Sequence, residues 1–139
     1  MWDSSIQSYR LKKRYRGSRY TNEQYHNSEI KLTRLIEAYY GSDDVRTGVH
    51  PIWAETDKGV LYEFDILIKS QKILVEYNGI QHYEYTKFFQ RTKKRFIDQK
   101  KRDKKKYKLA KDNGYKVIIF KYDEPLFKDY VISKIKGYI

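Results

Sequence analysis

Hydrophobic residues recur with two different spacings along the chain, and each spacing predicts one kind of element. From Leu32 to Tyr40 the apolar positions follow the i, i+3, i+4, i+7 pattern of one helix face. The pair Asn27-Ser28 can cap a helix before this face, and Gly41 can end it. We therefore predict a first helix that begins near Asn27 and ends at Gly41.

Three apolar segments after this helix have the length and the composition of strands. They cover residues 45–54, 60–69 and 72–78. The short Ser70-Gln71 linker predicts that the second and third segments form an antiparallel hairpin, and Asn78-Gly79 marks where its second strand ends.

A basic helix, a buried strand and a terminal helix complete the predicted order. They cover residues 92–113, 116–122 and 126–135. One stripe of the basic helix holds Phe96, Asp103, Tyr107 and Ala110, so this stripe is expected to face the core. The order α-β-β-β-α-β-α predicts an α/β fold, in which helices flank a mixed central sheet that contains the hairpin.

Residues 1–26 are basic and polar and have no clear periodicity. We predict that they form a basic N-terminal arm and that residues 27–139 form a single domain. Tyrosines alternate in the arm with Arg14, Arg16 and Arg19. Aromatic rings stack on bases while arginines hold phosphates, which favours nucleic-acid binding; the alternative is a tyrosine-rich surface tail.

The formal net charge of +12 indicates a polyanionic partner, with nucleic acid as the first candidate and an anionic membrane surface as the second. The chain has no cysteine, which excludes disulfides and thiolate metal sites. No apolar run approaches the roughly 20 residues of a membrane span, and the N-terminus lacks the apolar core of a signal peptide. We therefore expect a soluble, cytoplasmic protein.

Two carboxylates occupy the predicted hairpin. If the hairpin closes at Ser70-Gln71, Asp65 lies directly opposite Glu76, and both side chains point to the same face of the sheet. Facing carboxylates repel each other unless a cation lies between them, and oxygen ligands of this kind suit Mg²⁺ or Mn²⁺. The alternative is a register shifted by one residue, or one carboxylate on an exposed sheet face.

Other titratable residues fall near this pair in the predicted fold. Glu29 and Asp103 lie on the buried faces of their helices, where a carboxylate is costly without a partner. Asp98 lies across the helix from Phe96 and is expected to be solvated. His82 follows the hairpin closely and suits the deprotonation of a water near neutral pH, although a lone histidine is more often structural. Acids on separate buried faces suggest one shared site.

Three segments together resemble a known superfamily: YEFDILI, ILVEYNGIQHY and RDKKKYKLAKDNGYKVIIFKY. They resemble the PD-(D/E)XK nucleases, and more closely the branch that contains very-short-patch repair endonucleases and phage homing endonucleases. That branch is marked by a helix Glu, a strand Asp, a His and a later helix Asp. Glu29, Asp65, His82 and Asp103 match these positions, and the resemblance covers roughly residues 27–123.

The resemblance implies a restriction-endonuclease-like fold and a metal-dependent hydrolysis of DNA phosphodiester bonds. Asp65 and Glu76 would bind Mg²⁺ or Mn²⁺. The usual lysine of the E-x-K triplet is replaced by Asn78, so His82 and Gln81 would orient or deprotonate the attacking water. Repair members of the branch carry a zinc site with cysteines, and because this chain has none, mismatch specificity does not carry over.

Supporting roles also follow from the resemblance. Glu29 and Asp103 would hold a water on the metal, or would hold His82.

With one site per domain, a double-strand break would need a homodimer or two sequential nicks. A phage-encoded origin, in a bacterial or phage-infected cell, would fit this branch, and the role would be homing, junction resolution or repair.

Basic residues crowd the predicted helix over residues 92–113. Such a run is often only a solvated helix face, but beside a nuclease site it predicts contacts with the phosphates of double-stranded DNA. The residues expected to make them are Lys93, Lys94, Arg95, Lys101, Lys104 and Lys105. Two alternatives remain open: a non-catalytic nucleic-acid-binding module on a nuclease scaffold, and a nuclease or toxin directed at RNA.

Overall fold

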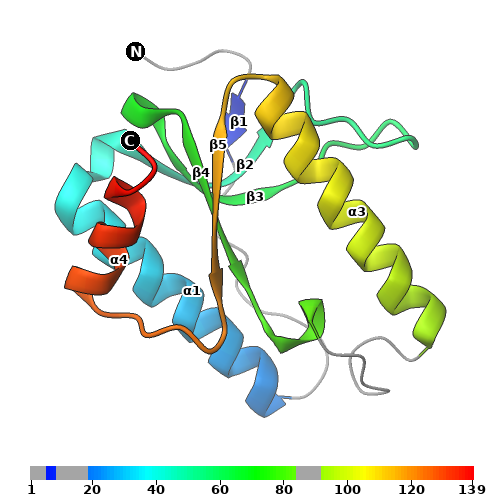
Figure 1. The fold of residues 1–139 in the computed structure, drawn as a ribbon, viewed down its shortest axis with the longest axis horizontal. Helices are drawn as coiled ribbons and strands as arrows, with labels where there is room; N and C mark the ends of the chain where they lie inside the picture. Colours follow the sequence, from blue (N-terminus) through cyan, green and yellow to red (C-terminus); the bar gives the residue numbers. More distant parts are fainter. Residues whose placement is uncertain (1–5, 9–18, 84–91) are drawn as a thin grey trace.

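A five-stranded mixed sheet forms the centre of the molecule in the computed structural model, which describes residues 6–8, 19–83 and 92–139 (Figure 1). Its spatial order is β1-β2-β3-β4-β5, and every neighbouring pair is antiparallel except β4 and β5, which are parallel. The strands are β1 (Ile6–Ser8), β2 (Val45–Pro51), β3 (Phe64–Ile68), β4 (Ile73–Asn78) and β5 (Lys116–Lys121).

Helices cover both faces of this sheet, as Figure 1 shows. The helices are α1 (Arg19–Tyr40), α3 (Lys93–Asp112) and α4 (Lys128–Lys136). Helices α1 and α4 lie together on one face, and α3 crosses the other as the connection between the parallel strands β4 and β5. The α/β fold and the mixed sheet with its hairpin are therefore confirmed.

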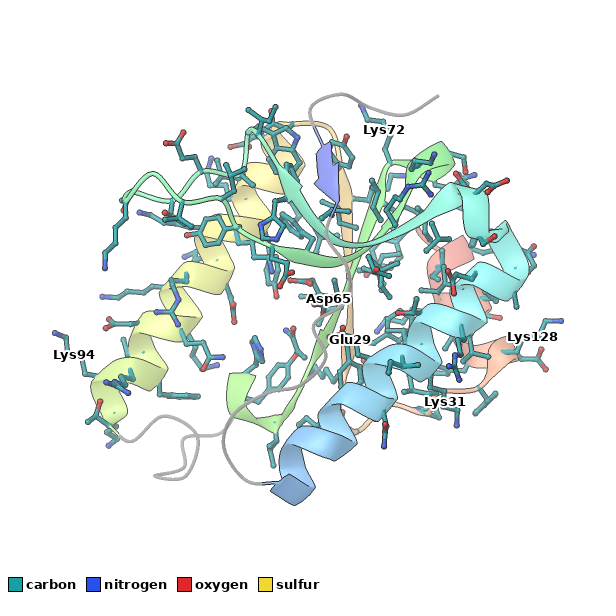
Figure 2. The ribbon with its side chains drawn as sticks, turned by 180° about the vertical axis from the view of Figure 1, so that it is seen from behind. Glu29, Lys31, Asp65, Lys72, Lys94 and Lys128 are labelled. Carbon is teal, nitrogen blue, oxygen red and sulfur yellow. The ribbon has the colours of Figure 1, made fainter. Side chains whose placement is uncertain are left out.

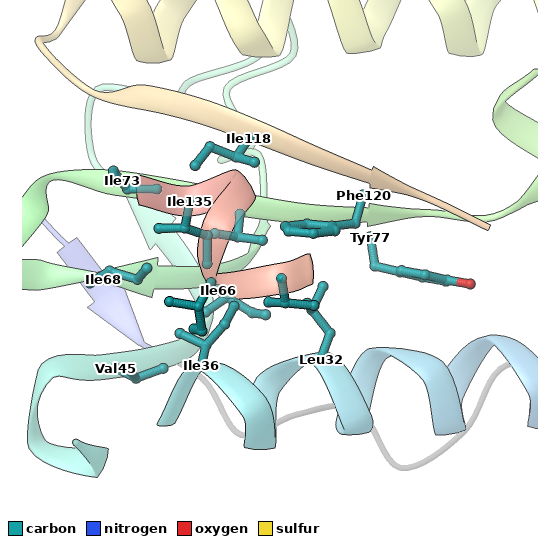
Figure 3. Packing of buried hydrophobic residues seen from close by; sticks show 13 residues of the cluster. Leu32, Ile36, Val45, Ile66, Ile68, Ile73, Tyr77, Ile118, Phe120 and Ile135 are labelled. Atoms are coloured by element: carbon teal, nitrogen blue, oxygen red, sulfur yellow. The ribbon is translucent and has the colours of Figure 1, made fainter. Parts of the chain in front are cut away.

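The larger core lies between the sheet and the pair α1 and α4 (Figure 3). Leu32 and Ile36 from α1 meet Ile66 and Phe120 from the sheet and Ile135 from α4, and all five are fully buried. Each such side chain contributes about 1.5–3 kcal/mol through the removal of apolar surface from water. This core holds the first helix against the sheet and so determines where its acidic residue lies.

A second, smaller core lies under α3. Ala110 and the partly buried Tyr107 pack there against Phe64, Leu74 and Tyr115. The predicted stripe of α3 therefore faces the sheet. Thr92 caps the helix by accepting a hydrogen bond from the Arg95 amide at 3.2 Å.

The hairpin has the predicted register. Ile66 pairs with Val75 and Ile68 pairs with Ile73. The turn is a short 3₁₀ segment, Lys69–Gln71, and Lys72 closes it in the left-handed region with φ 53°. Strand β3 is shorter than predicted, because residues 55–62 turn back on themselves through a bridge between Glu55 and Leu61.

The start of the first helix was predicted wrongly. Helix α1 begins at Arg19 instead of near Asn27, so the predicted boundary between residues 26 and 27 falls inside the helix. Strand β1 pairs with the edge of β2, with Gln7 opposite His50. Backbone hydrogen bonds suffice for such an edge strand, so it leaves no alternation of apolar residues in the sequence. The first turns of α1 precede its apolar face and likewise leave no periodic signal.

Among the described helices, none combines the length and the apolar composition that crossing a bilayer requires.

Candidate active site

The candidate site lies where two neighbouring strands separate. Registered pairing between β3 and β4 ends at Ile66 and Val75. Strand β3 stays with β2 as far as Phe64, whereas β4 stays with β5 as far as Asn78. Beyond this last pair the two strands diverge, and the sheet forks between Asp65 on β3 and Glu76 on β4.

The two carboxylates bridge this fork with reciprocal hydrogen bonds. The Asp65 amide donates to Glu76 Oε2 at 2.8 Å, and the Tyr77 amide donates to Asp65 Oδ2 at 2.8 Å. Each carboxylate thus satisfies a backbone donor that the interrupted ladder leaves without a carbonyl partner. The predicted juxtaposition of Asp65 and Glu76 is confirmed, and one oxygen of each side chain remains for another partner.

Glu29 brings a third carboxylate to the fork from α1. It is only 2% exposed, and Figure 2 shows it beside Asp65. The Thr33 hydroxyl donates to the Glu29 carbonyl at 2.9 Å, one turn further along the helix. Burial raises the pKa of Asp65 well above its usual value, and the charges of Glu76 and Glu29 raise it further. The predicted convergence of acids from separate elements is therefore confirmed for these three residues.

Lys106 supplies the positive charge of the site, and sequence reasoning placed it only in a basic run. Its ammonium group forms an ion pair with Glu76 Oε1 and lies 4.6 Å from the centre of the Phe64 ring. Burial opposes its charge, but Glu76 and Asp65 together raise the pKa of Lys106 above its usual value. One signal could have identified it: Lys106 lies three residues after Asp103, on the same face of the helix.

His82 and Asp103 form a second pair beside the acidic cluster. His82 Nδ1 lies 2.8 Å from Asp103 Oδ2, and both side chains are largely buried. The 3₁₀ turn Ile80–His82 follows β4 directly and presents the histidine to α3. A carboxylate on Nδ1 favours the tautomer in which Nδ1 carries the proton and Nε2 is left as the base. The predicted proximity of His82 and Asp103 is confirmed.

Asn78 occupies the position where the resemblance expects a lysine. Its amide donates to the hydroxyls of Tyr83 and Tyr107, at 3.4 Å and 3.3 Å. Burial raises the pKa of Tyr107, and the charge of Glu76 adds to the effect. Asn78 therefore ties the end of β4 to α3, and the ammonium group near Glu76 comes from Lys106 instead.

The acidic cluster has the composition of a divalent-cation site but lacks a complete cage. Within the described residues, no three His, Asp or Glu side chains are arranged to hold a metal ion by themselves. Mg²⁺ commonly needs only one or two carboxylates, since waters and substrate phosphates complete its shell. Glu29, Asp65 and Glu76 bring three carboxylates to the fork, and a divalent ion bound there would offset the repulsion between them.

The remaining predicted residues lie further from the cluster or outside the described part of the chain. Arg14 and Arg16 belong to the residues outside it. Arg19 is the first residue of α1, and Gln81 lies in the 3₁₀ turn beside His82, but neither side chain is described. On α3, the basic residues predicted to bind DNA are all exposed: Lys93, Lys94, Arg95, Lys101, Lys104 and Lys105. Asp98, expected to be solvated, is only partly exposed.

The chain is similar to two viral proteins. It is 30% identical over 92 residues to uncharacterized protein 307L of Invertebrate iridescent virus 6, which covers 65% of the chain and 47% of that protein. It is 42% identical over 48 residues to uncharacterized protein 033L of Invertebrate iridescent virus 3, which covers 34% of the chain and 25% of that protein. The chain thus spans about half or less of these relatives. No family profile matches it, and no solved structure matches it.

Proposed function

We propose that the protein is a metal-dependent endonuclease that hydrolyses phosphodiester bonds in DNA. The observation that carries this proposal is the fork between β3 and β4, where Glu29, Asp65 and Glu76 from different elements meet beside the His82–Asp103 pair. A structural ion pair needs only one carboxylate for one cation. Each additional buried carboxylate raises the free energy of ionising the others, so several acids in one buried place favour a functional role.

Asp65 and Glu76 would hold Mg²⁺ or Mn²⁺ through the oxygens that do not accept backbone hydrogen bonds. Such an ion, when bound, polarises the phosphate and stabilises the charge that develops on it. Glu76 Oε1 is shared with Lys106, so Lys106 would release it and turn its ammonium group toward the anionic phosphate. Lys106 would then provide the positive charge that Asn78 cannot.

His82 would take the proton from the attacking water through Nε2. Asp103 holds the opposite ring nitrogen, so it fixes the orientation of the ring and stabilises the charged form that proton transfer produces. Glu29 would not need to bind the ion directly, because its negative charge near Asp65 makes the electrostatic potential at the site more favourable for a cation. The exposed basic residues at the start of α3, Lys93, Lys94 and Arg95, would hold neighbouring phosphates of the duplex.

Plasmid cleavage tests this proposal directly. Supercoiled DNA is incubated with the protein in Mg²⁺, in Mn²⁺ and in EDTA, with matched RNA as a second substrate. Nicked or linear DNA that appears only with a divalent ion supports the proposal, whereas cleavage in EDTA or no cleavage under any condition contradicts it. Preferential cleavage of RNA would support a nuclease directed at RNA instead.

A non-catalytic nucleic-acid-binding module is the second candidate. The ion pair of Lys106 with Glu76 favours it, because this lysine already neutralises part of the acidic cluster without a metal. Under this alternative the carboxylates only close the fork in the sheet. Binding of DNA that is indifferent to Mg²⁺, combined with the absence of cleavage, would support it.

A further inference from the structure

A groove runs along α3 on the side that faces away from the candidate active site. Its volume is about 820 Å³, and its walls are residues 56–62 of the β2–β3 connection and the outer face of α3. With roughly 100° of rotation per helical residue, Lys101, Lys104 and Lys108 lie about 100–160° from Asp103. The helix therefore separates the groove from the His82–Asp103 pair.

The groove is strongly basic. Its lining contains two carboxylates, Asp57 and Asp98, and a larger set of cations: Lys58, Lys101, Arg102, Lys104, Lys105 and Lys108. Lys105 pairs with Asp57, and Lys108 pairs with Asp112 outside the lining. For the part of the chain that the structure describes, no ion pair involves Lys101 or Lys104. The six cations exceed the two lining carboxylates by four charges, or by three once Asp112 is counted, and this surplus fits a polyanion.

The groove also offers apolar surface beside these charges. Val60 is 63% exposed on the loop wall, and the partly buried Tyr62 lies next to it in the lining. The aliphatic stems of the lysines add to this surface. A basic groove with an aromatic ring is the combination by which proteins hold single strands, since phosphates meet the cations and bases meet the ring.

We propose that this groove holds an unpaired strand of nucleic acid that extends from the DNA cut at the candidate active site. The inference rests on the proposed function and narrows its substrate class to DNA with a single-stranded extension. A volume of about 820 Å³ is that of a pocket for a drug-sized molecule, which corresponds to about one or two nucleotides.

The test compares two triple variants with equal losses of charge. The groove variant carries Lys101→Gln, Lys104→Gln and Lys108→Gln. The control carries Lys31→Gln, Arg34→Gln and Lys128→Gln. All six side chains are exposed, so both variants should fold, and Figure 2 shows Lys31 and Lys128 on the opposite side of the molecule from α3.

Binding is measured in EDTA with a fluorescent duplex that carries a single-stranded overhang, and with the same duplex made blunt. We expect the groove variant to bind the overhang substrate about 10–100-fold more weakly, with a salt slope flatter by up to about 2, since each phosphate contact on a single strand contributes about 0.7. The loss on the blunt duplex should be at least several-fold smaller. The control variant should show nearly equal, small losses on both.

Equal losses on the two substrates, or losses no larger than those of the control, would overturn the assignment. Poly-glutamate and single-stranded DNA of equal charge are also compared as competitors for the overhang substrate. If poly-glutamate displaces the overhang as effectively as the DNA does, the groove binds an acidic protein segment instead, and the assignment is overturned. A Lys→Arg version of the groove variant should keep its affinity, because the contacts are with phosphates.

Cleavage of the same substrates in Mg²⁺ separates this inference from the proposed function. A wild-type protein that binds overhangs through the groove but never cuts would contradict the proposed function and leave the groove assignment standing. If the wild type cuts DNA, and the groove variant binds and cuts overhang substrates as well as the wild type does, the groove assignment alone is contradicted.

Discussion

Asp65→Asn is the sharpest test of the site, because the structure predicts opposite effects on activity and on stability. Asn keeps an oxygen that can accept the hydrogen bond from the Tyr77 amide, so the fork in the sheet should persist. The substitution removes a carboxylate whose pKa is raised by burial and by Glu76 and Glu29, so stability in EDTA should be equal to or higher than that of the wild type. Cleavage should fall by at least about 10³-fold, which corresponds to about 4 kcal/mol of transition-state stabilisation.

Asp65→Ala is the matched control for this variant. It removes the same charge but leaves the Tyr77 amide without its acceptor, which costs about 1–3 kcal/mol. In a domain of this size, that loss lowers the thermal midpoint by roughly 3–10 °C relative to Asp65→Asn. Thermal denaturation in EDTA and plasmid cleavage in Mg²⁺ measure the two effects. An Asp65→Asn protein that cuts at nearly the wild-type rate, or one that is less stable than Asp65→Ala, would refute this account of the fork.

Further predictions concern the neighbours of Asp65. Lys106→Met should lower the free energy of unfolding in EDTA, measured with urea, by about 3–5 kcal/mol, because Glu76 stays buried without its cationic partner. An unchanged urea midpoint would show that the ion pair contributes nothing to stability. Asp103→Asn should slow cleavage strongly and Asp98→Asn only slightly, because Asp103 contacts His82 whereas Asp98 lines the groove on the other side of α3; the reverse ranking would contradict the assignment. His82→Ala should lower the rate by about 10²–10⁴-fold and recover partly at high pH, where hydroxide is more available; unchanged kinetics in a folded protein would make His82 structural. Because the folded protein raises the pKa of Asp65, this residue adds stability at low pH that is lost as the pH rises through the folded pKa. The wild type should therefore lose stability in EDTA relative to Asp65→Asn as the pH rises above about 4, the ordinary pKa of an aspartate; urea midpoints that stay parallel from acid to neutral pH would argue against the shift.

The hairpin could be predicted from local signals, and the acidic pair followed from it. Ser70-Gln71 is a short linker between two apolar runs, and a hairpin that closes at this linker pairs residues whose numbers sum to 141. Because side chains alternate along a strand, that register alone set Asp65 opposite Glu76. The helix stripe that contains Asp103 was equally local, since its apolar neighbours recur at helical spacing.

The parts that could not be predicted depend on contacts that are distant in sequence. The fork requires β3 to follow β2 while β4 follows β5, and nothing within the hairpin itself indicates that divergence. Lys106 was hidden among neighbouring lysines, because a run of like charges does not show which of its members faces the core, and its spacing of three residues from Asp103 was the one local signal. Strand β1 joins the sheet through backbone pairing, so its side chains carry no periodic pattern.

The crossover between β4 and β5 determines when Lys106 reaches the acidic pair during folding. The hairpin of β3 and β4 joins residues that are close in sequence, so it can form early and bring Asp65 and Glu76 together at once. Lys106 arrives only when α3 packs against the sheet, which accompanies the pairing of β5 beside β4 across a long connection. Until then the two carboxylates face each other without their counter-charge. A chain interrupted within α3 would therefore hold a repelling pair in its hairpin, and divalent ions should accelerate folding by screening that pair before the helix arrives.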